Sequence, residues 1–238
     1  SFPTRRSSDL TPQPDPMSAP STDAVVADAR PDRLRITEIF LSLQGESRTV
    51  GLPTVFVRLT GCPLRCVYCD TEYAFHGGEW LTNEVVLGRV AGYPARHVTV
   101  TGGEPLAQKG CPPLLRRLCD AGYEVSVETS GALDIGPVDT RVSRVLDLKT
   151  PGSGEAHRNR LENLPLLTAN DQVKFVICDR QDYEWARAMV AEHGLAERCE
   201  VLFSPSHGEM PAAELADWVV ADGLPVRFQI QLHKYLWG

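Results

Sequence analysis

Cys62-Pro63-Leu64-Arg65-Cys66-Val67-Tyr68-Cys69 places three thiols within eight residues and runs directly into Asp70-Thr71. The stretch follows the apolar run 54–60, so the thiols lie on a loop at the end of an expected strand. Three thiolates on one tight loop can converge on a single inorganic centre. A [4Fe-4S] cluster normally takes four cysteines, so this loop would leave one iron open to a ligand from outside the chain.

Two other uses of the cysteines compete with this one. Structural zinc needs four ligands, and His76 could supply the fourth, but the paired CxxC spacing of zinc sites is absent. A disulfide framework fits poorly, because seven cysteines in 238 residues are neither dense nor even in number. The other four cysteines lack cluster spacing, and we expect Cys119 to pack as a small apolar side chain.

The composition is that of a soluble protein and argues against two broad classes. Hydrophobic residues make up 42% and charged residues 23%, and the net charge is -7. A general nucleic-acid or membrane-surface binder would show basic stripes. No apolar run is long enough to span a bilayer, and residues 1–33 lack the apolar region of a secretory signal. We therefore expect a cytoplasmic protein, in which the thiols stay reduced.

Two regions are expected along the chain. Residues 1–33 hold repeated prolines without a periodic apolar pattern, which predicts a disordered extension. Met17 looks like a more natural start than Ser1, and residues 1–16 would then be non-native. Residues 34–238 are expected to form one catalytic domain, because barrels of alternating strands and helices commonly reach this size.

Strand-like and helix-like segments alternate from Arg35 onward, which is typical of parallel βαβ units. After an alternating stretch at 36–40, the expected strands are 54–60, 97–101, 124–130, 144–149, 171–177, 201–204 and 226–233. The expected helices are 82–91, 112–121, 155–163, 181–193 and 211–221. The pattern predicts an α/β fold, an incomplete (β/α)6 TIM-like barrel.

Within these strands, polar residues alternate with apolar ones at a period of two. If helices cover the apolar faces, the polar side chains point into the barrel. A solvated face of an open antiparallel sheet could explain one strand, but it fits poorly with helices between the strands. Because buried charges are costly unless paired, we expect a binding site there. Its expected lining is Arg58, Glu128, Asp147, Lys149, Lys174, Gln231 and His233.

A glycine-rich element, Thr101-Gly102-Gly103-Glu104-Pro105, directly follows the expected strand 97–101. Its two glycines let the backbone approach a ligand closely, and the Glu104 carboxylate could pair with an ammonium group. Gly45 provides a second turn with exposed backbone, where the edge of a ligand could be read.

Taken together, these motifs resemble those of the 7-carboxy-7-deazaguanine synthase family, within the radical S-adenosylmethionine superfamily, over residues 34–238. The cysteine loop and the Gly-Gly-Glu-Pro turn are features of the whole superfamily. The stretches Leu43-Gln44-Gly45-Glu46 and His233-Lys234-Tyr235-Leu236 are similar to the family itself.

The resemblance implies a lyase of queuosine (7-deazapurine) biosynthesis. It would convert 6-carboxy-5,6,7,8-tetrahydropterin to 7-carboxy-7-deazaguanine with release of ammonia, by a 5′-deoxyadenosyl radical mechanism. The implied cofactors are a [4Fe-4S] cluster on the catalytic Cys62, Cys66 and Cys69, S-adenosylmethionine, and Mg²⁺ on Thr71. The residues implied to contact S-adenosylmethionine are Tyr68, Cys69, Asp70, Gly103, Glu104, Asp147, Leu148, Lys149, Ser204, Pro205, Ser206 and His207.

A substrate site and partners are implied in the same way. Arg58 would meet the substrate carboxylate, which its planar guanidinium suits. Mg²⁺ would bind weakly without substrate, because a hydroxyl alone is a weak ligand. The expected partners are an electron donor such as flavodoxin or ferredoxin and a second copy in a homodimer, with no nucleic acid and no membrane. The residues implied to line the substrate site are Leu43, Gln44, Gly45, Glu46, Arg58, Thr101, His233 and Gly238.

Two other functions stay open from the sequence. A glycyl-radical-enzyme activase shares the three-thiol loop, but it takes a protein segment as substrate and needs an open groove. A non-catalytic metal-binding or electron-transfer module would close its metal site with its own side chains. One position also departs from the family pattern, since Ser47 stands where glycine is common after Leu-Gln-Gly-Glu.

Overall fold

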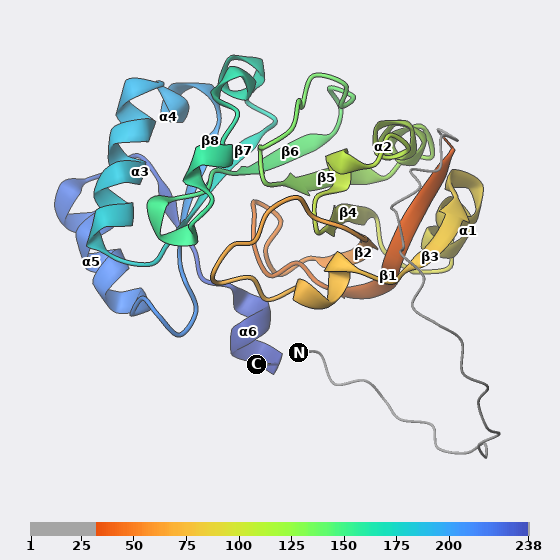
Figure 1. Ribbon diagram of the computed structural model, residues 1–238, viewed down its shortest axis with the longest axis horizontal. Helices are drawn as coiled ribbons and strands as arrows, with labels where there is room; N and C mark the ends of the chain where they lie inside the picture. The colour runs from red at the N-terminus through yellow and green to blue at the C-terminus, as the bar shows by residue number, and fades with distance from the viewer. Residues whose placement is uncertain (1–31, 238) are drawn as a thin grey trace, which may run out of the picture.

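The structure is a computed structural model that describes residues 32–237, and Figure 1 shows its arrangement. The expected extension 1–33 lies almost entirely outside the described residues, as does Gly238. The first strand begins at Arg33, close to the expected start of the domain. Among residues 32–237, no helix has both the length and the apolar character needed to cross a membrane.

Nine strands form one sheet in the order β3-β1-β2-β4-β5-β6-β7-β8-β9. β1 runs antiparallel to β2 and β3, and the neighbours from β2 to β9 are parallel. Because β3 and β9 do not pair with each other, the sheet stays open, and the fold is the incomplete TIM-like barrel that the sequence predicts. The strands are β1 (Arg33–Leu43), β2 (Pro53–Leu59), β3 (Glu79–Thr82), β4 (His97–Gly102), β5 (Glu124–Thr129), β6 (Ser143–Asp147), β7 (Gln172–Ile177), β8 (Glu200–Pro205) and β9 (Arg227–Phe228).

Helices pack against the apolar face of this sheet in two groups, which lie on opposite sides of the view in Figure 1. One apolar core joins α1 and α2 to β1, β2, β4 and β5, and the other joins α3, α4 and α5 to β6, β7 and β8. Side chains cap the N-termini of two helices. The Thr82 hydroxyl accepts a hydrogen bond from Val85 N at the start of α1, and the Asp179 carboxylate accepts one from Asp182 N at the start of α3. The helices are α1 (Asn83–Ala91), α2 (Cys111–Asp120), α3 (Arg180–Glu192), α4 (Leu195–Arg198), α5 (Ala212–Asp222) and α6 (Leu232–Trp237).

Two expected elements are wrong. The helix expected at 155–163 is replaced by short 3₁₀ turns, Ala156–Arg158 and Leu161–Leu166. The Asn159 amide exchanges hydrogen bonds with the backbone of Lys149, and Pro165 cannot donate a helical hydrogen bond, so a continuous helix is disfavoured. The strand expected at 226–233 is limited to β9, and the chain turns into α6 from Leu232.

The β1–β2 hairpin reaches across the open side of the sheet and contacts its far strands. Arg48 N donates to Gln172 Oε1 of β7 at 2.6 Å, and Arg48 Nε pairs with Glu200 of β8 at 3.0 Å. The Arg48 guanidinium also donates to the carbonyls of Ala169 and Asp171. The hairpin tip therefore joins the early strands to the late ones through side chains rather than through a β ladder.

Ser47 at this tip adopts the left-handed conformation, with φ 66°, and is buried. A non-glycine residue there is strained, because its Cβ crowds the backbone. Glycine adopts the same conformation without this penalty, which gives a physical reason to expect glycine at this position.

We expect Ser47→Gly to raise the free energy of unfolding by about 1 kcal/mol, since the relief of strain exceeds the entropy that glycine adds to the unfolded chain. Ser47→Ala is the matched control: it keeps the Cβ and loses the contact between Ser47 Oγ and Thr49 Oγ1 at 3.2 Å, so it brings no gain. Urea unfolding measures both variants. A Ser47→Gly protein no more stable than Ser47→Ala would contradict the strain argument.

Candidate active site

The three-thiol loop begins at the carboxyl end of β2, as expected. Cys62, Cys66 and Cys69 are partly exposed and form no disulfide. Leu64 is buried beneath the loop, and its amide donates to Cys62 Sγ at 3.4 Å. Burial raises the pKa of the Cys66 thiol to about 11. The Cys66 thiol thus stays protonated until a metal centre displaces the proton.

The Gly-Gly-Glu-Pro turn holds one side of this loop through the backbone. Gly103 N donates to Leu59 O at 3.1 Å, and Glu104 N donates to Gly61 O at 2.8 Å. A Cβ at position 103 would lie 2.2 Å from Gly61 O and 2.8 Å from Cys62 Cβ. Gly103 is therefore required for the turn to approach the cysteine loop.

The Glu104 carboxylate has a different role from the expected ammonium contact. It is fully buried and accepts hydrogen bonds from Thr129 Oγ1 (2.8 Å), Ser130 N (2.7 Å), Ser130 Oγ (2.5 Å) and Leu106 N (3.0 Å). These donors hold the end of β5 against the turn. A ligand at this turn would meet main-chain groups, because the carboxylate is already used by the chain's own donors.

A second set of contacts, the Ser153 clamp, holds the cysteine loop. It comes from residues that the sequence pattern does not single out. Val67 N donates to Ser153 O at 3.1 Å, and Arg65 N donates to Glu155 Oε1 at 2.7 Å. The buried Asp182 carboxylate fixes this clamp, because it accepts hydrogen bonds from Thr150 Oγ1 and Gly152 N. The Pro151-Gly152-Ser153-Gly154 run is a turn signal that could have identified the segment as a loop.

Gln44 is buried and reaches polar side chains of the predicted lumen. Its amide nitrogen donates to Thr99 Oγ1 at 3.1 Å and to Glu128 Oε1 at 3.3 Å. Thr101 Oγ1 donates to the other oxygen of Glu128 at 3.2 Å. Burial raises the pKa of Glu128, which lies on the lumen face of β5. These contacts confirm that polar side chains of β4 and β5 face inward and meet the hairpin.

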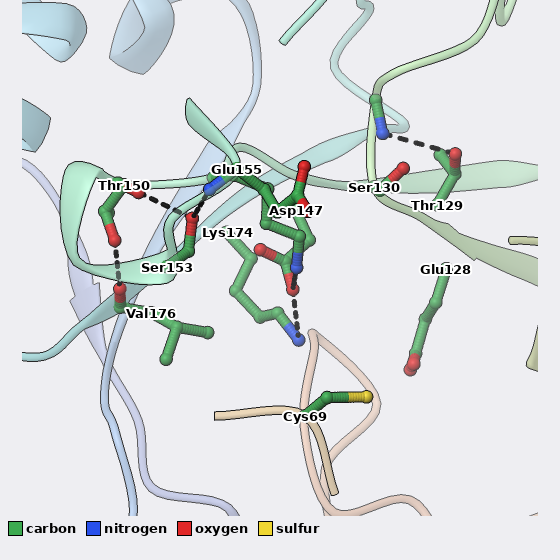
Figure 2. Close-up of polar contacts among 12 residues, drawn as sticks. Cys69, Glu128, Thr129, Ser130, Asp147, Thr150, Ser153, Glu155, Lys174 and Val176 are labelled. Carbon is green, nitrogen blue, oxygen red and sulfur yellow. Dashed lines mark hydrogen bonds and ion pairs between the residues drawn. The ribbon is translucent and has the colours of Figure 1, made fainter. Parts of the chain in front are cut away.

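A chain of charges continues from the hairpin to β7 and β6. Lys174 Nζ contacts the Glu46 carboxylate and lies 3.3 Å from Asp147 Oδ2, and Lys149 Nζ lies 3.1 Å from the same oxygen. Burial opposes the charge on Lys174, but the carboxylates of Glu46, Asp147 and Glu128 hold its pKa well above the usual value. Figure 2 shows Lys174, Asp147 and Glu128 directed toward the space beside Cys69. The lumen therefore places paired charges next to the thiol loop.

The C-terminal segment closes a further side of this space. Gln231 Nε2 donates to Glu46 Oε1 at 2.7 Å, and Leu232 N donates to Gly45 O at 2.9 Å. A Cβ at Gly45 would lie 2.2 Å from His233 Nδ1, so the glycine admits the His233 ring. Burial lowers the pKa of His233. The segment also reaches the cysteine loop, because Lys234 Nζ pairs with Asp70 at 2.8 Å.

The remaining predicted site residues differ in exposure. Leu43 lies at the end of β1, and Thr71 Oγ1 lies 3.3 Å from Asp70 Oδ1. The Leu148 side chain belongs to the apolar core, so only its backbone can face a ligand. At the end of β8, Ser204, Pro205 and Ser206 are buried, whereas His207 is exposed. Gly238 lies outside the described residues.

Three buried polar atoms, on the loop and at the carboxyl ends of β6 and β8, have no hydrogen-bond partner within residues 32–237: Tyr68 Oη, Asp147 Oδ1 and Ser204 Oγ. Lys149 Nζ lies 5.7 Å from the centre of the Tyr68 ring and 3.1 Å from Asp147 Oδ2, so Lys149 connects Tyr68 with Asp147. Burying an unpaired polar group costs free energy unless a ligand or water satisfies it. In the part of the chain that is described, no three His, Cys, Asp or Glu side chains form a site for one metal ion. A polar ligand bound beside the three-thiol loop would satisfy these atoms.

Gly103→Ala is expected to push the cysteine loop away from the turn and to lower the iron and sulfide bound after anaerobic reconstitution, because the new Cβ meets backbone. Gly88→Ala in α1 is the matched control, since its Cβ would meet nothing within 4 Å. Iron and sulfide assays with an EPR spectrum of the reduced protein measure the effect. Full cluster content in Gly103→Ala would show that the close approach is dispensable.

Comparisons with known proteins agree with this geometry. Residues 56–192 match the sequence model of the Radical SAM superfamily. A 7-carboxy-7-deazaguanine synthase from Koribacter versatilis is 43% identical over 86% of this chain and 97% of its own length, and one from Chlorobaculum tepidum is 44% identical over 86% and 94%. The crystal structure of QueE from Escherichia coli shares the fold, with a TM-score of 0.70 and 24% identity over 84% of this chain and 95% of that one. This chain therefore belongs to the 7-carboxy-7-deazaguanine synthase family of the Radical SAM superfamily.

Proposed function

We propose that this chain is a radical S-adenosylmethionine lyase that converts 6-carboxy-5,6,7,8-tetrahydropterin to 7-carboxy-7-deazaguanine with release of ammonia, in queuosine (7-deazapurine) biosynthesis. Curated relatives with this name, 31–44% identical to the chain, support it. The observation that carries it is the buried polar lumen beside the three-thiol loop, in which Gln44, Glu46, Glu128 and Lys174 face one space.

Cys62, Cys66 and Cys69 would hold the [4Fe-4S] cluster, and S-adenosylmethionine would bind beside it. When bound, these groups supply the one-electron chemistry that activates a carbon–hydrogen bond of the substrate. The chain's own residues position the ligands and exclude water. Two observations support this assignment. The backbone at Gly103 and Glu104 contacts the start of the loop, and the Tyr68–Asp70 and Asp147–Lys149 segments lie close to each other. Tyr68 Oη, Asp147 Oδ1 and Ser204 Oγ are buried polar atoms that a bound ligand would satisfy.

The substrate would lie in the lumen between the hairpin and the strands. Gln44 and Glu46 offer amide and carboxylate groups to the amino and ring N–H edge of a pterin, and Thr101 and His233 border the same space. The hairpin and the C-terminal segment lie across the lumen, an arrangement that suits a small molecule rather than a protein segment. Arg58, on the lumen face of β2, would bind the substrate carboxylate.

Further assignments have less support and rest on the family resemblance. Mg²⁺ would bind Thr71 together with substrate oxygens and water, because one hydroxyl cannot complete an octahedron. A flavodoxin or ferredoxin would supply electrons, two copies would form a homodimer, and the protein would work in the cytoplasm. Thr71 lies two residues after the last thiol, with its hydroxyl 4.0 Å from Cys69 Sγ, and this position supports the metal site.

Removing Arg58 should separate substrate binding from cofactor cleavage. We expect Arg58→Ala to raise KM for the carboxylated pterin by roughly 10- to 100-fold, or to abolish product, while uncoupled cleavage of S-adenosylmethionine continues. Arg89→Ala, which breaks an exposed ion pair with Glu79, is the control and should keep wild-type kinetics. Product and 5′-deoxyadenosine are quantified by chromatography. Undiminished product formation by Arg58→Ala would remove Arg58 from the substrate site.

Removing one thiol should abolish both reactions. We expect Cys66→Ala to form neither product nor 5′-deoxyadenosine, because two thiolates cannot hold the cluster in place. Cys119→Ala is the control, since Cys119 lies on α2 away from the loop. An anaerobic assay with the carboxylated pterin tests the proposed function directly. A reconstituted wild-type protein that cleaves S-adenosylmethionine but leaves this pterin unchanged would overturn it.

A further inference from the structure

The Arg58 guanidinium is held through its Nε atom. Arg58 Nε donates to Glu38 Oε1 at 2.7 Å, and the guanidinium carbon lies 5.9 Å and 5.8 Å from the centres of the Phe40 and Tyr73 rings. The Arg58 side chain is 11% exposed. Within residues 32–237, neither Nη atom of Arg58 donates a hydrogen bond to protein. The edge formed by the two Nη atoms is therefore available to a planar anion.

A β-bulge in β1 brings Glu38 to this position. Ile36 pairs with Leu59 and Glu38 pairs with Arg58, so Thr37 is the extra residue. In a regular ladder Thr37 would oppose Arg58, because partners advance by one residue on each strand. Thr37 instead contacts Thr60 through its hydroxyl at 2.8 Å. Bulges often redirect a side chain next to a functional site, and this one places a carboxylate opposite the only lumen-facing arginine of β2.

Tyr73 fixes the carboxylate from the other side. Its hydroxyl donates to Glu38 Oε1 at 2.9 Å, the oxygen that also accepts from Arg58. Burial raises the pKa of Tyr73 to about 12, so the phenol keeps the proton that it donates. Tyr73 lies in the 3₁₀ turn Glu72–Phe75, which directly follows the three-thiol loop. The cradle of Arg58 is thus built from β1, β2 and the end of that loop.

We propose that Glu38, anchored by Tyr73, is a positioning residue that aims the two Nη atoms of Arg58 into the lumen for the substrate carboxylate. The inference rests on the proposed function, in which Arg58 binds that carboxylate. Glu38 acts through geometry and not through its charge. Its negative charge opposes a second carboxylate nearby, whereas its oxygen fixes the plane of the guanidinium, so an uncharged acceptor of the same shape should replace it.

Two purines that differ only in the carboxylate provide the test. Binding of 7-carboxy-7-deazaguanine and of 7-deazaguanine is measured by calorimetry, on anaerobic reconstituted protein with S-adenosylmethionine present. We expect Glu38→Ala to weaken binding of the carboxylated purine by roughly tenfold and binding of 7-deazaguanine by less than about twofold, because only the first ligand needs the oriented guanidinium. Glu38→Gln should bind both ligands as the wild type does, or the carboxylated one more tightly.

Two further variants separate positioning from folding. Tyr73→Phe removes only the hydroxyl of a half-exposed ring, and it should weaken binding of the carboxylated purine alone, by roughly two- to fivefold. Glu79 lies in the neighbouring strand β3, and its exposed carboxylate pairs with Arg89 of α1. Glu79→Ala removes this carboxylate and should leave both affinities unchanged.

Each remaining outcome counts against a stated claim. Equal weakening of both purines by Glu38→Ala, or no weakening of either, overturns the positioning role, as does a Glu38→Gln protein as defective as Glu38→Ala. Wild-type protein that binds neither purine overturns the proposed function instead, because that failure precedes any variant.

Discussion

The contact between Lys174 and Glu46 is the constraint on which the site depends. An ammonium and a carboxylate are both withdrawn from water here, and each is tolerated only because the other neutralises it. The pair ties the hairpin tip to β7 across an open sheet that no β ladder closes. It thereby fixes the position of Gln44 over Glu128 and the shape of the lumen.

Two backbone contacts help to set the three-thiol loop above this lumen. Gly61 receives the Gly-Gly-Glu-Pro turn on one side, and Val67 donates to the Ser153 carbonyl on the other. Buried carboxylates hold both supports, Glu104 through β5 and Asp182 through the turn after β6. The loop is consequently attached to strands of both apolar cores, so its position follows the fold of the whole sheet.

The sequence predicts the parallel strands and the inward polar face well, because both depend on a local alternation of apolar and polar residues. It fails where an element depends on distant partners. Residues 155–163 have the composition of a helix, yet Asn159 bonds back to Lys149. Residues after β9 alternate like a strand, yet Gly45 and Glu46 draw them into the site. Periodicity also cannot reveal a bulge, so the pairing of Glu38 with Arg58 was not foreseen.

The Glu104 carboxylate has a structural role that its sequence motif does not indicate. Within residues 32–237, its hydrogen bonds come from donors of this chain, so the glycine-rich turn presents peptide groups, not a side chain, to whatever lies beside the thiols. Peptide groups are the same whichever side chain the residue carries. Recognition through peptide groups depends on the conformation of the main chain. A point mutation can disturb it only by changing that conformation.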